Sequence, residues 1–229
     1  METQLRLSDF DHPSIINLSA RLTDGQATVL EKVKRIFYFV RDEIKFGFTP
    51  QWDKVKASEV LNYGLGYCNT KATLFVALCR ASGIEAKVHF GLIDIRIMRG
   101  IMPGFVFPFM PKLGGHSWID VMLDGQWKSI DSYINDEAFY GRALKRLKHS
   151  GRPLGYSLSF KDGKSSCEFN FGEQGFVHMG AVREDHGVWE DAADYFTTDL
   201  YVRFNKIQAM SYPLLAVMSN RNIARIRQG

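Results

Sequence analysis

A loop with two glycines leads directly into an apolar helix, and this stretch constrains the fold more than any other part of the sequence. The loop covers residues 64–68 and ends in Cys68, and the apolar positions that follow recur at helical spacing up to Ser82. Gly83 supplies the left-handed residue that commonly ends a helix. Cys68 is therefore expected at a helix N-terminus, where free N–H groups and the helix dipole favour a thiolate over a thiol. This position predicts a cysteine nucleophile.

The composition indicates a globular protein without a nucleic-acid partner. The chain has 229 residues, of which 45% are hydrophobic, so it can bury a sizeable core. One domain with elaborations is the simplest interpretation, and two compact halves are the alternative. Basic residues number 29 and acidic residues 25, with no basic run of five or more, which is typical of a solvated surface.

The cysteines and the N-terminal residues indicate where the protein works. Cys68, Cys79 and Cys167 show neither the spacing of a zinc site nor the pattern of a disulfide framework, which favours a reducing compartment. Residues 1–11 lack the apolar core of a signal peptide, and no run of 18 apolar residues is present. We therefore expect a cytoplasmic protein that does not contact a membrane.

Periodicity predicts the elements around the cysteine. Helices are expected at residues 13–22, 28–44 and 56–61, and residues 85–92 alternate as a half-buried strand with His89 on its solvent face. The longest irregular stretch, residues 94–115, sets three prolines among many large apolar side chains. Loops of this length are usually functional or disordered, and this one is too apolar to stay solvated, so we expect a lid or substrate-facing wall, with packing over the sheet edge as the alternative.

A hairpin follows the irregular stretch. Asp124-Gly125 separates two alternating runs, which predicts a two-residue type I′ turn with Leu123 opposite Gln126. In that register His116 and Asp131 become diagonal neighbours on one face of the sheet. A cysteine, an imidazole and a carboxylate are the parts of a thiol acyl-transfer site, namely a nucleophile, a base and a group that orients the base.

Three motifs, in this order, resemble the transglutaminase-like superfamily. They are Gly-x-Cys opening a helix that ends Cys-Arg-Ala-Ser-Gly-Ile, then His-Ser-Trp-Ile-Asp-Val at 116–121, then Trp-Lys-Ser-Ile-Asp at 127–131. The resemblance covers roughly residues 30–135. It implies a papain-like α+β core in which the nucleophile helix packs on an antiparallel sheet. It also implies that Cys68 is the nucleophile, His116 the general base and acid, and Asp131 the orienting group. A family member that keeps the fold without the activity is the alternative.

The oxyanion hole and the cleft are less defined by the sequence. The backbone N–H of Cys68 is one expected donor. Asn62 lies six residues before the cysteine, where papain-like enzymes carry a glutamine, although a role at the end of the preceding helix is the alternative. Trp52 and Trp118 are the aromatic residues expected to line the cleft.

The chain divides at residue 150 into an expected catalytic core with N-terminal helices, 1–150, and a C-terminal extension that packs on it, 151–229. Within the extension, residues 154–160 and 167–171 are expected to form a hairpin, and residues 191–201 and 206–226 to form helices, the second interrupted by Pro213. His178, Asp185 and His186 lack the spacing of metal ligands, so we expect neither a metal nor another cofactor.

The predicted activity is thiol-dependent acyl transfer on an amide or peptide carbonyl through a thioester on Cys68. Water would make the protein an amidase, deamidase or peptidase, and an amine would make it a transamidase. The expected partner is a peptide, a protein or a small amide. An arylamine N-acetyltransferase-like enzyme and an inactive binding module of the same fold are the alternatives.

Overall fold

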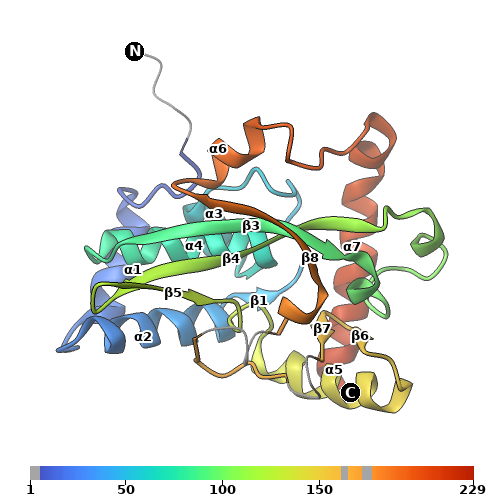
Figure 1. Ribbon diagram of the computed structural model, residues 1–229, viewed down its shortest axis with the longest axis horizontal. Coiled ribbons are helices and arrows are strands. Elements are labelled where there is room, and N and C mark those ends of the chain that lie inside the picture. Colours follow the sequence, from blue (N-terminus) through green and yellow to red (C-terminus); the bar gives the residue numbers. More distant parts are fainter. Residues whose placement is uncertain (1–5, 161–164, 172–176) are drawn as a thin grey trace.

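The structure is a computed structural model that describes residues 6–160, 165–171 and 177–229. Its main sheet has four antiparallel strands in the order β5-β4-β3-β8, and helix α4 packs against β3 and β4 with α1, α2 and α3 around it (Figure 1). The helices are α1 (Pro13–Thr23), α2 (Val29–Asp42), α3 (Ala57–Tyr63), α4 (Cys68–Ala81), α5 (Glu137–Ser150), α6 (Ala192–Thr197) and α7 (Lys206–Gln228). The strands of the main sheet are β3 (Ala86–Asp94), β4 (Leu113–Leu123), β5 (Gln126–Ile130) and β8 (Val182–Trp189).

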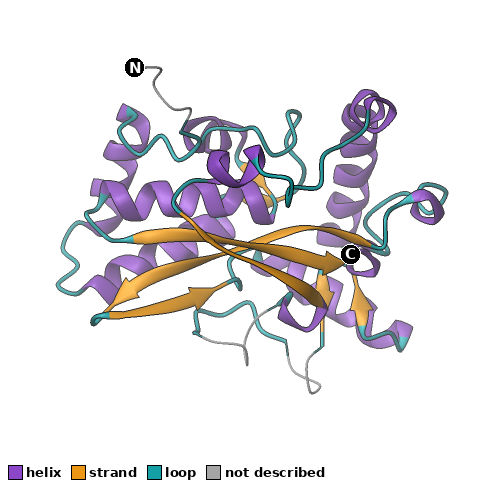
Figure 2. Cartoon of the chain, turned by 45° about the horizontal axis from the view of Figure 1, so that its top comes forward, coloured by secondary structure: helices purple, strands orange, loops and turns teal. Residues whose placement is uncertain are grey.

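Short elements complete the fold. Two-residue strands form a parallel pair, β1 (Lys45–Phe46) with β2 (Leu65–Gly66), and an antiparallel pair, β6 (Leu154–Gly155) with β7 (Leu158–Ser159). Short 3-10 turns lie at Ile95–Met98, Phe107–Phe109 and Met179–Ala181. Figure 2 colours helices and strands differently and shows that the fold contains both. This is the α+β architecture that the sequence predicts, with the nucleophile helix against an antiparallel sheet.

The start of α4 is fixed by local hydrogen bonds and by a close approach of the backbone. Tyr67 donates its N–H to Thr70 Oγ1 at 3.0 Å, which caps the first turn. A Cβ on Gly66 would come within 2.8 Å of Thr70 Oγ1 and 2.9 Å of Lys71 Cγ, so only glycine lets β2 pass this close to the helix. Cys68 is the first residue of α4, as the sequence predicts.

The β4–β5 hairpin has the predicted register. Leu123 pairs with Gln126 across a turn in which Asp124 and Gly125 both have positive φ, which is the geometry of a type I′ turn. Ile119 and Val121 belong to the main hydrophobic core. The alternate residues of β4, which include His116, therefore lie on the other face of the strand.

A fully buried lysine joins α4 to two other segments. Lys71 Nζ donates to the backbone carbonyls of Arg41 at 3.2 Å, Tyr133 at 2.9 Å and Ile134 at 2.9 Å. Arg41 is in the last turn of α2, and Tyr133 and Ile134 follow β5. Burial lowers the pKa of Lys71 to about 7, although the charge of Asp136 acts in the opposite direction. One side chain thus fixes the cysteine helix relative to the segment that carries Asp131.

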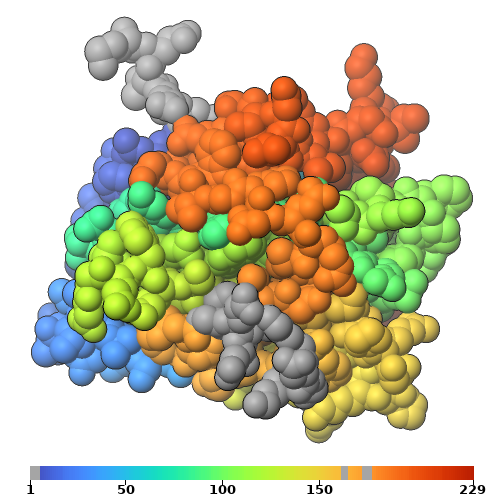
Figure 3. All heavy atoms as spheres, viewed as in Figure 1, coloured from blue at the N-terminus to red at the C-terminus, as the bar shows by residue number. Residues whose placement is uncertain are grey.

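The C-terminal third contributes to both the sheet and the helical wall. Strand β8 pairs with β3, and residues of the C-terminal third, coloured orange, lie across the front of the molecule in the space-filling view (Figure 3). Helix α7 is held by Asn220, whose side chain accepts from the N–H of Phe48 at 2.8 Å and donates to its carbonyl at 3.0 Å. Arg227 pairs with the buried carboxylate of Asp136 at 2.7 Å.

Three expectations for the C-terminal third are wrong. Residues 154–160 pair within themselves, because Tyr156 and Ser157 adopt positive φ and turn β6 directly into β7, and residues 167–171 form no strand. Residues 161–164, which include the expected turn, lie outside the described part. Helix α6 is shorter than predicted, and α7 continues through Pro213, although a proline cannot donate a backbone hydrogen bond to the residue four positions earlier. Among the described residues, no helix is both long and apolar enough to cross a membrane.

Candidate active site

Cys68 lines a pocket, and its surroundings raise the pKa of its thiol. The residue is half-buried, and its Sγ lies 3.5 Å from Asn69 Oδ1. Burial, and then the charge of Asp53, raise the pKa of Cys68 to about 12, although backbone hydrogen bonds at Ser117, Asn69 and Cys68 act against them. The backbone N–H groups of Cys68 and Asn69 at the helix start lower this pKa, as the sequence predicts, but burial and Asp53 outweigh them.

A buried carboxylate lies behind the cysteine. Asp53 accepts hydrogen bonds from Asn69 Nδ2 at 2.8 Å, from Tyr201 Oη at 2.9 Å and from the hydroxyl of Tyr67. Burial raises its pKa despite these donors. Because Asp53 binds the amide nitrogen of Asn69, the amide oxygen is left toward the thiol of Cys68. The network positions a group that accepts the S–H proton in a hydrogen bond.

The candidate base, His116, is held on β4 and is only 2% exposed. It pairs in the sheet with Gly91, where a Cβ would come within 2.4 Å of the carbonyl oxygen of Glu184 on β8, so a glycine is needed for three strands to pack here. Its Nε2 is buried and has no hydrogen-bond partner in the described structure. Burial, and then the neighbouring His178, lower the pKa of His116 well below its ordinary value, so the ring is neutral.

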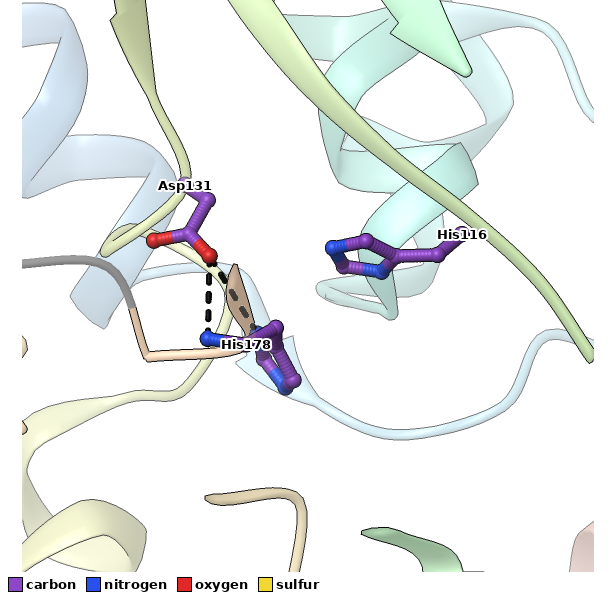
Figure 4. A group of neighbouring side chains, drawn as sticks. All are labelled: His116, Asp131 and His178. Carbon is purple, nitrogen blue, oxygen red and sulfur yellow. Dashed lines mark hydrogen bonds and ion pairs between the residues drawn. The ribbon is translucent and has the colours of Figure 1, made fainter. Parts of the chain in front are cut away.

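Asp131 comes close to His116, as the hairpin register predicts, but it is bonded elsewhere. Its fully buried carboxylate accepts the backbone N–H groups of Val177 at 2.9 Å and of His178 at 3.0 Å. Burial raises the pKa of Asp131 to about 7, while these two N–H groups lower it. The nitrogen and oxygen atoms that His116, Asp131 and His178 offer lie within 4.8 Å of one another (Figure 4).

The structure brings His178, which the sequence analysis sets aside because of its spacing, next to His116 and Asp131. Its ring centroid lies 5.1 Å from that of His116, its Nδ1 lies 3.9 Å from Asp131 Oδ2, and its Nε2 lies 2.9 Å from Ser157 Oγ. Burial lowers the pKa of His178 to about 3, although a backbone hydrogen bond at Ser157 acts in the opposite direction. His178 precedes β8, and the pairing of β8 with β3 and the hydrogen bonds of residues 177 and 178 with Asp131 bring it to the site. No local spacing in the sequence could signal that neighbourhood.

The pocket at this site is largely apolar. It has a volume of about 340 Å³, and Cys68, His116 and His178 are among its lining residues. Residues of the 94–115 stretch and of α7 supply much of the apolar wall, which supports the first of the two interpretations of that stretch, a substrate-facing wall. In Figure 3 part of this stretch projects at the edge of the molecule beside α7. The wall residues from these two regions include Ile95, Ile97, Met98, Met102, Val106, Phe109, Ile207 and Leu215.

The three weaker site residues have different positions. Trp52 lines the pocket, with positive φ, and its ring contacts those of Tyr67 and Phe204 at centroid distances of 5.1 and 4.5 Å. Trp118 is buried and stacks on His89 at 4.1 Å, and it is not among the residues that line the pocket. Asn62 is exposed on α3 and is likewise not brought into the pocket.

The expectation that His89 is solvent-exposed is wrong. The ring is only partly exposed, because Nδ1 lies 3.1 Å from Asp120 and Nε2 lies 2.7 Å from Asp185. These hydrogen bonds raise the pKa of His89, although burial, the largest single influence, lowers it. His89 and Asp185 are therefore part of a polar cluster on the outer face of the sheet, apart from the pocket.

Comparisons with known proteins identify the family of this chain. The family model described as the transglutaminase-like superfamily matches residues 16–132, about half of the chain. No curated protein sequence matches significantly. A proposed cysteine protease from Cytophaga hutchinsonii has a similar structure, with a TM-score of 0.48 and 15% identity over 83% of this chain and 46% of that one. A proposed protease from Parabacteroides distasonis has a TM-score of 0.41 and 17% identity over 55% of this chain and 24% of that one. This chain spans less than half the length of either protein. On the family match, the chain belongs to the transglutaminase-like superfamily.

Proposed function

We propose that the protein is a cysteine-nucleophile acyl-transfer enzyme that accepts apolar acyl groups. The observation that carries this proposal is that Cys68 and His116 open into the same apolar pocket, with Asp131 next to the histidine. A nucleophile, a neutral base and a carboxylate are the groups that thiol acyl transfer needs.

The reaction begins from a neutral pair in this proposal. The thiol of Cys68 is protonated and the ring of His116 is neutral, so the base removes the proton as sulfur attacks the carbonyl carbon. The backbone N–H of Cys68, at the start of α4, donates to the developing oxyanion. His116 then protonates the leaving group, and a thioester remains on Cys68.

Asp131 stabilises the charged form of the histidine. Its carboxylate lies within 4.8 Å of the His116 ring, and the imidazolium that forms during attack would gain a negative neighbour there. Water resolves the thioester in a hydrolase, and an amine resolves it in a transamidase. Both outcomes use the same three residues.

The pocket favours an apolar acyl group or an apolar side chain next to the scissile bond. Its described lining residues include no lysine or arginine that could pair with a phosphate or a carboxylate. The one carboxylate in the lining, Asp53, is already bonded to three donors. This lining does not favour the acetyl-coenzyme A reaction of an N-acetyltransferase, because that cofactor carries phosphates.

A non-catalytic binding module is favoured by one specific observation. His116 Nε2 has no hydrogen-bond partner among the described residues, so the link between base and carboxylate that orients a catalytic histidine is not formed. On this alternative the apolar pocket would bind its ligand without turnover.

An acyl series on a chromogenic leaving group tests the proposal. The wild type is mixed with p-nitrophenyl esters from acetate to octanoate, and the burst of p-nitrophenol and the mass of the acylated chain are measured. We expect one acyl group per chain, on Cys68, with rates that rise with acyl length. Cys167→Ala is the matched control, because Cys167 is buried away from the pocket lining.

The outcomes separate the alternatives. Retention of the burst in Cys68→Ala, or the absence of any adduct on Cys68, would sink the enzyme proposal and leave the binding module. Adding a primary alkylamine should give the N-alkyl amide of the acyl group in a transamidase, whereas a strict hydrolase should release only the free acid. Rapid acetylation of Cys68 by acetyl-coenzyme A would instead support the N-acetyltransferase alternative.

A further inference from the structure

We infer that His116, Asp131 and His178 form a binding site for a transition metal ion of the zinc type, and that its occupancy switches off the reaction proposed above. The metal site stands on its own geometry. Only the inhibition rests on the proposed function.

The first observation is convergence of three buried ligand groups. One nitrogen from each histidine and one oxygen of Asp131 lie within 4.8 Å of one another (Figure 4). His116 is on β4, Asp131 follows β5 and His178 precedes β8, so three separate segments deliver them to one point. All three residues are at least nine-tenths buried. Small movements of the side chains would bring these atoms to bonding distance from a shared ion.

The second observation is that two of these atoms have no hydrogen-bond partner among the described residues. His116 Nε2 and His178 Nδ1 are both buried without a hydrogen bond in the described structure. A buried polar atom without a hydrogen bond is destabilising, and two such atoms next to each other are uncommon in folded proteins. Both nitrogens could donate their lone pairs to a bound metal cation.

Neighbouring groups hold the ligands in the required orientation. His178 Nε2 lies 2.9 Å from Ser157 Oγ, and a donated N–H there leaves the lone pair on Nδ1, the atom nearer Asp131. The backbone N–H groups of Val177 and His178 fix both oxygens of Asp131. Metal-binding histidines commonly donate their second N–H to such a partner, which fixes the tautomer and the ring.

The ligand set indicates which ion would bind. Two imidazoles and one carboxylate suit Zn²⁺, which takes three protein ligands and a water in many sites, whereas Ca²⁺ and Mg²⁺ prefer oxygen ligands alone. A metal on His116 Nε2 leaves the ring proton on Nδ1. The ring then has no free lone pair to accept the proton of Cys68, so attack on the carbonyl stops until the metal leaves.

Metal binding is tested directly, on chain that has been stripped with a chelator. We expect ZnCl₂ to bind at one ion per chain by calorimetry. Co²⁺ should give the visible bands of a tetrahedral site without a thiolate charge-transfer band. His178→Gln should weaken binding by about 100-fold or more, since even the loss of an outer partner costs 10–100-fold. Asp131→Asn is the second variant, because it keeps the side-chain shape.

Matched controls separate this site from other metal binding. His149→Gln removes an exposed histidine of α5 and should leave the affinity unchanged. Cys68→Ala should also bind Zn²⁺ with unchanged affinity, because no sulfur is in the ligand set. Loss of binding in Cys68→Ala, or unchanged binding in both His178→Gln and Asp131→Asn with wild-type thermal melting, would overturn the inference.

The same titration followed with ester turnover separates the two proposals. Zn²⁺ should abolish the burst of the wild type, and a chelator should restore it. Turnover that persists with the site fully occupied would overturn the inhibition. Metal binding without any turnover in metal-free protein would leave the metal site standing and count against the proposed function. Turnover without metal binding would support the proposed function and overturn the metal site.

Discussion

The Oδ2 atom of Asp131 accepts a hydrogen bond of 3.0 Å from the backbone N–H of His178, a residue 47 positions further along the chain. The carboxylate beside the candidate base is therefore held by the C-terminal third. Its position depends on how residues 177 and 178 pack, and not only on the hairpin that contains it. The orienting group and the segment that fixes it form one structural unit.

Replacement of Asp131 tests this unit. We predict that Asp131→Asn lowers kcat for ester turnover by about 10²–10⁴-fold, because the imidazolium loses its negative neighbour. The measurement is made with a chelator present. Asp120→Asn is the matched control, since Asp120 is a similarly buried aspartate of β4 that contacts His89 and Ser129 instead. Equal losses of activity in both variants would point to a general structural effect.

The reactivity of Cys68 should follow its raised pKa. We predict that its alkylation by iodoacetamide, followed by mass spectrometry, keeps accelerating with pH above the roughly 8.5 of a free thiol. Asp53→Asn should lower the apparent pKa, because the charge of Asp53 is the second largest influence raising it. Tyr63→Phe, on the exposed surface of α3, should leave it unchanged. A wild-type profile that levels off below pH 8 would contradict this prediction and restore the thiolate expected from the sequence.

Lys71 should make stability depend on pH. Its pKa is lowered from 10.5 to about 7 on folding, so between these values the unfolded chain binds a proton that the folded chain lacks. The free energy of unfolding should therefore rise between pH 7 and pH 10.5, by up to about 1.4 kcal/mol per pH unit. Below pH 7 Lys71 is protonated in both states and should not affect the pH dependence of stability. Urea unfolding from pH 7 to 9.5 should show the rise in the wild type and a smaller one in Lys71→Met. Identical slopes would show that Lys71 keeps its proton in the fold.

The clamp between Asn220 and Phe48 should stabilise α7. We predict that Asn220→Ala lowers the free energy of unfolding by about 1–3 kcal/mol, because the N–H and the carbonyl of Phe48 both lose their partner. Arg221→Ala changes the next residue, which is exposed, and should have little effect. Urea unfolding compares them, and equal effects would mean that the clamp contributes nothing.

The sequence predicts the part of the site whose residues are close in the chain. The Asp124-Gly125 turn alone sets the register that brings His116 near Asp131, and the glycine loop alone places Cys68 at the start of α4. Both are local signals with strong steric causes. The family resemblance implies roles for these residues, and the family match confirms the fold.

The remaining features depend on contacts between distant segments. His178 reaches the site through the pairing of β8 with β3, and the acidity of Cys68 is set by burial and by Asp53. The turn at Tyr156 and Ser157 uses positive φ at two residues that rarely adopt it, so composition points to Asp162-Gly163 instead. These features depend on contacts between segments that are distant in the sequence, and such contacts cannot be predicted from local sequence patterns.

The family match ends at residue 132, and this boundary has an evolutionary consequence. Cys68, His116 and Asp131 lie before it, whereas His178, Phe204 and the pocket-lining residues of α7 lie after it. Mutations in the later segment can therefore reshape the wall of the pocket while the three earlier residues stay as they are. On the proposed function, descendants of one ancestral catalyst could diverge in the acyl groups they select without reinventing the chemistry.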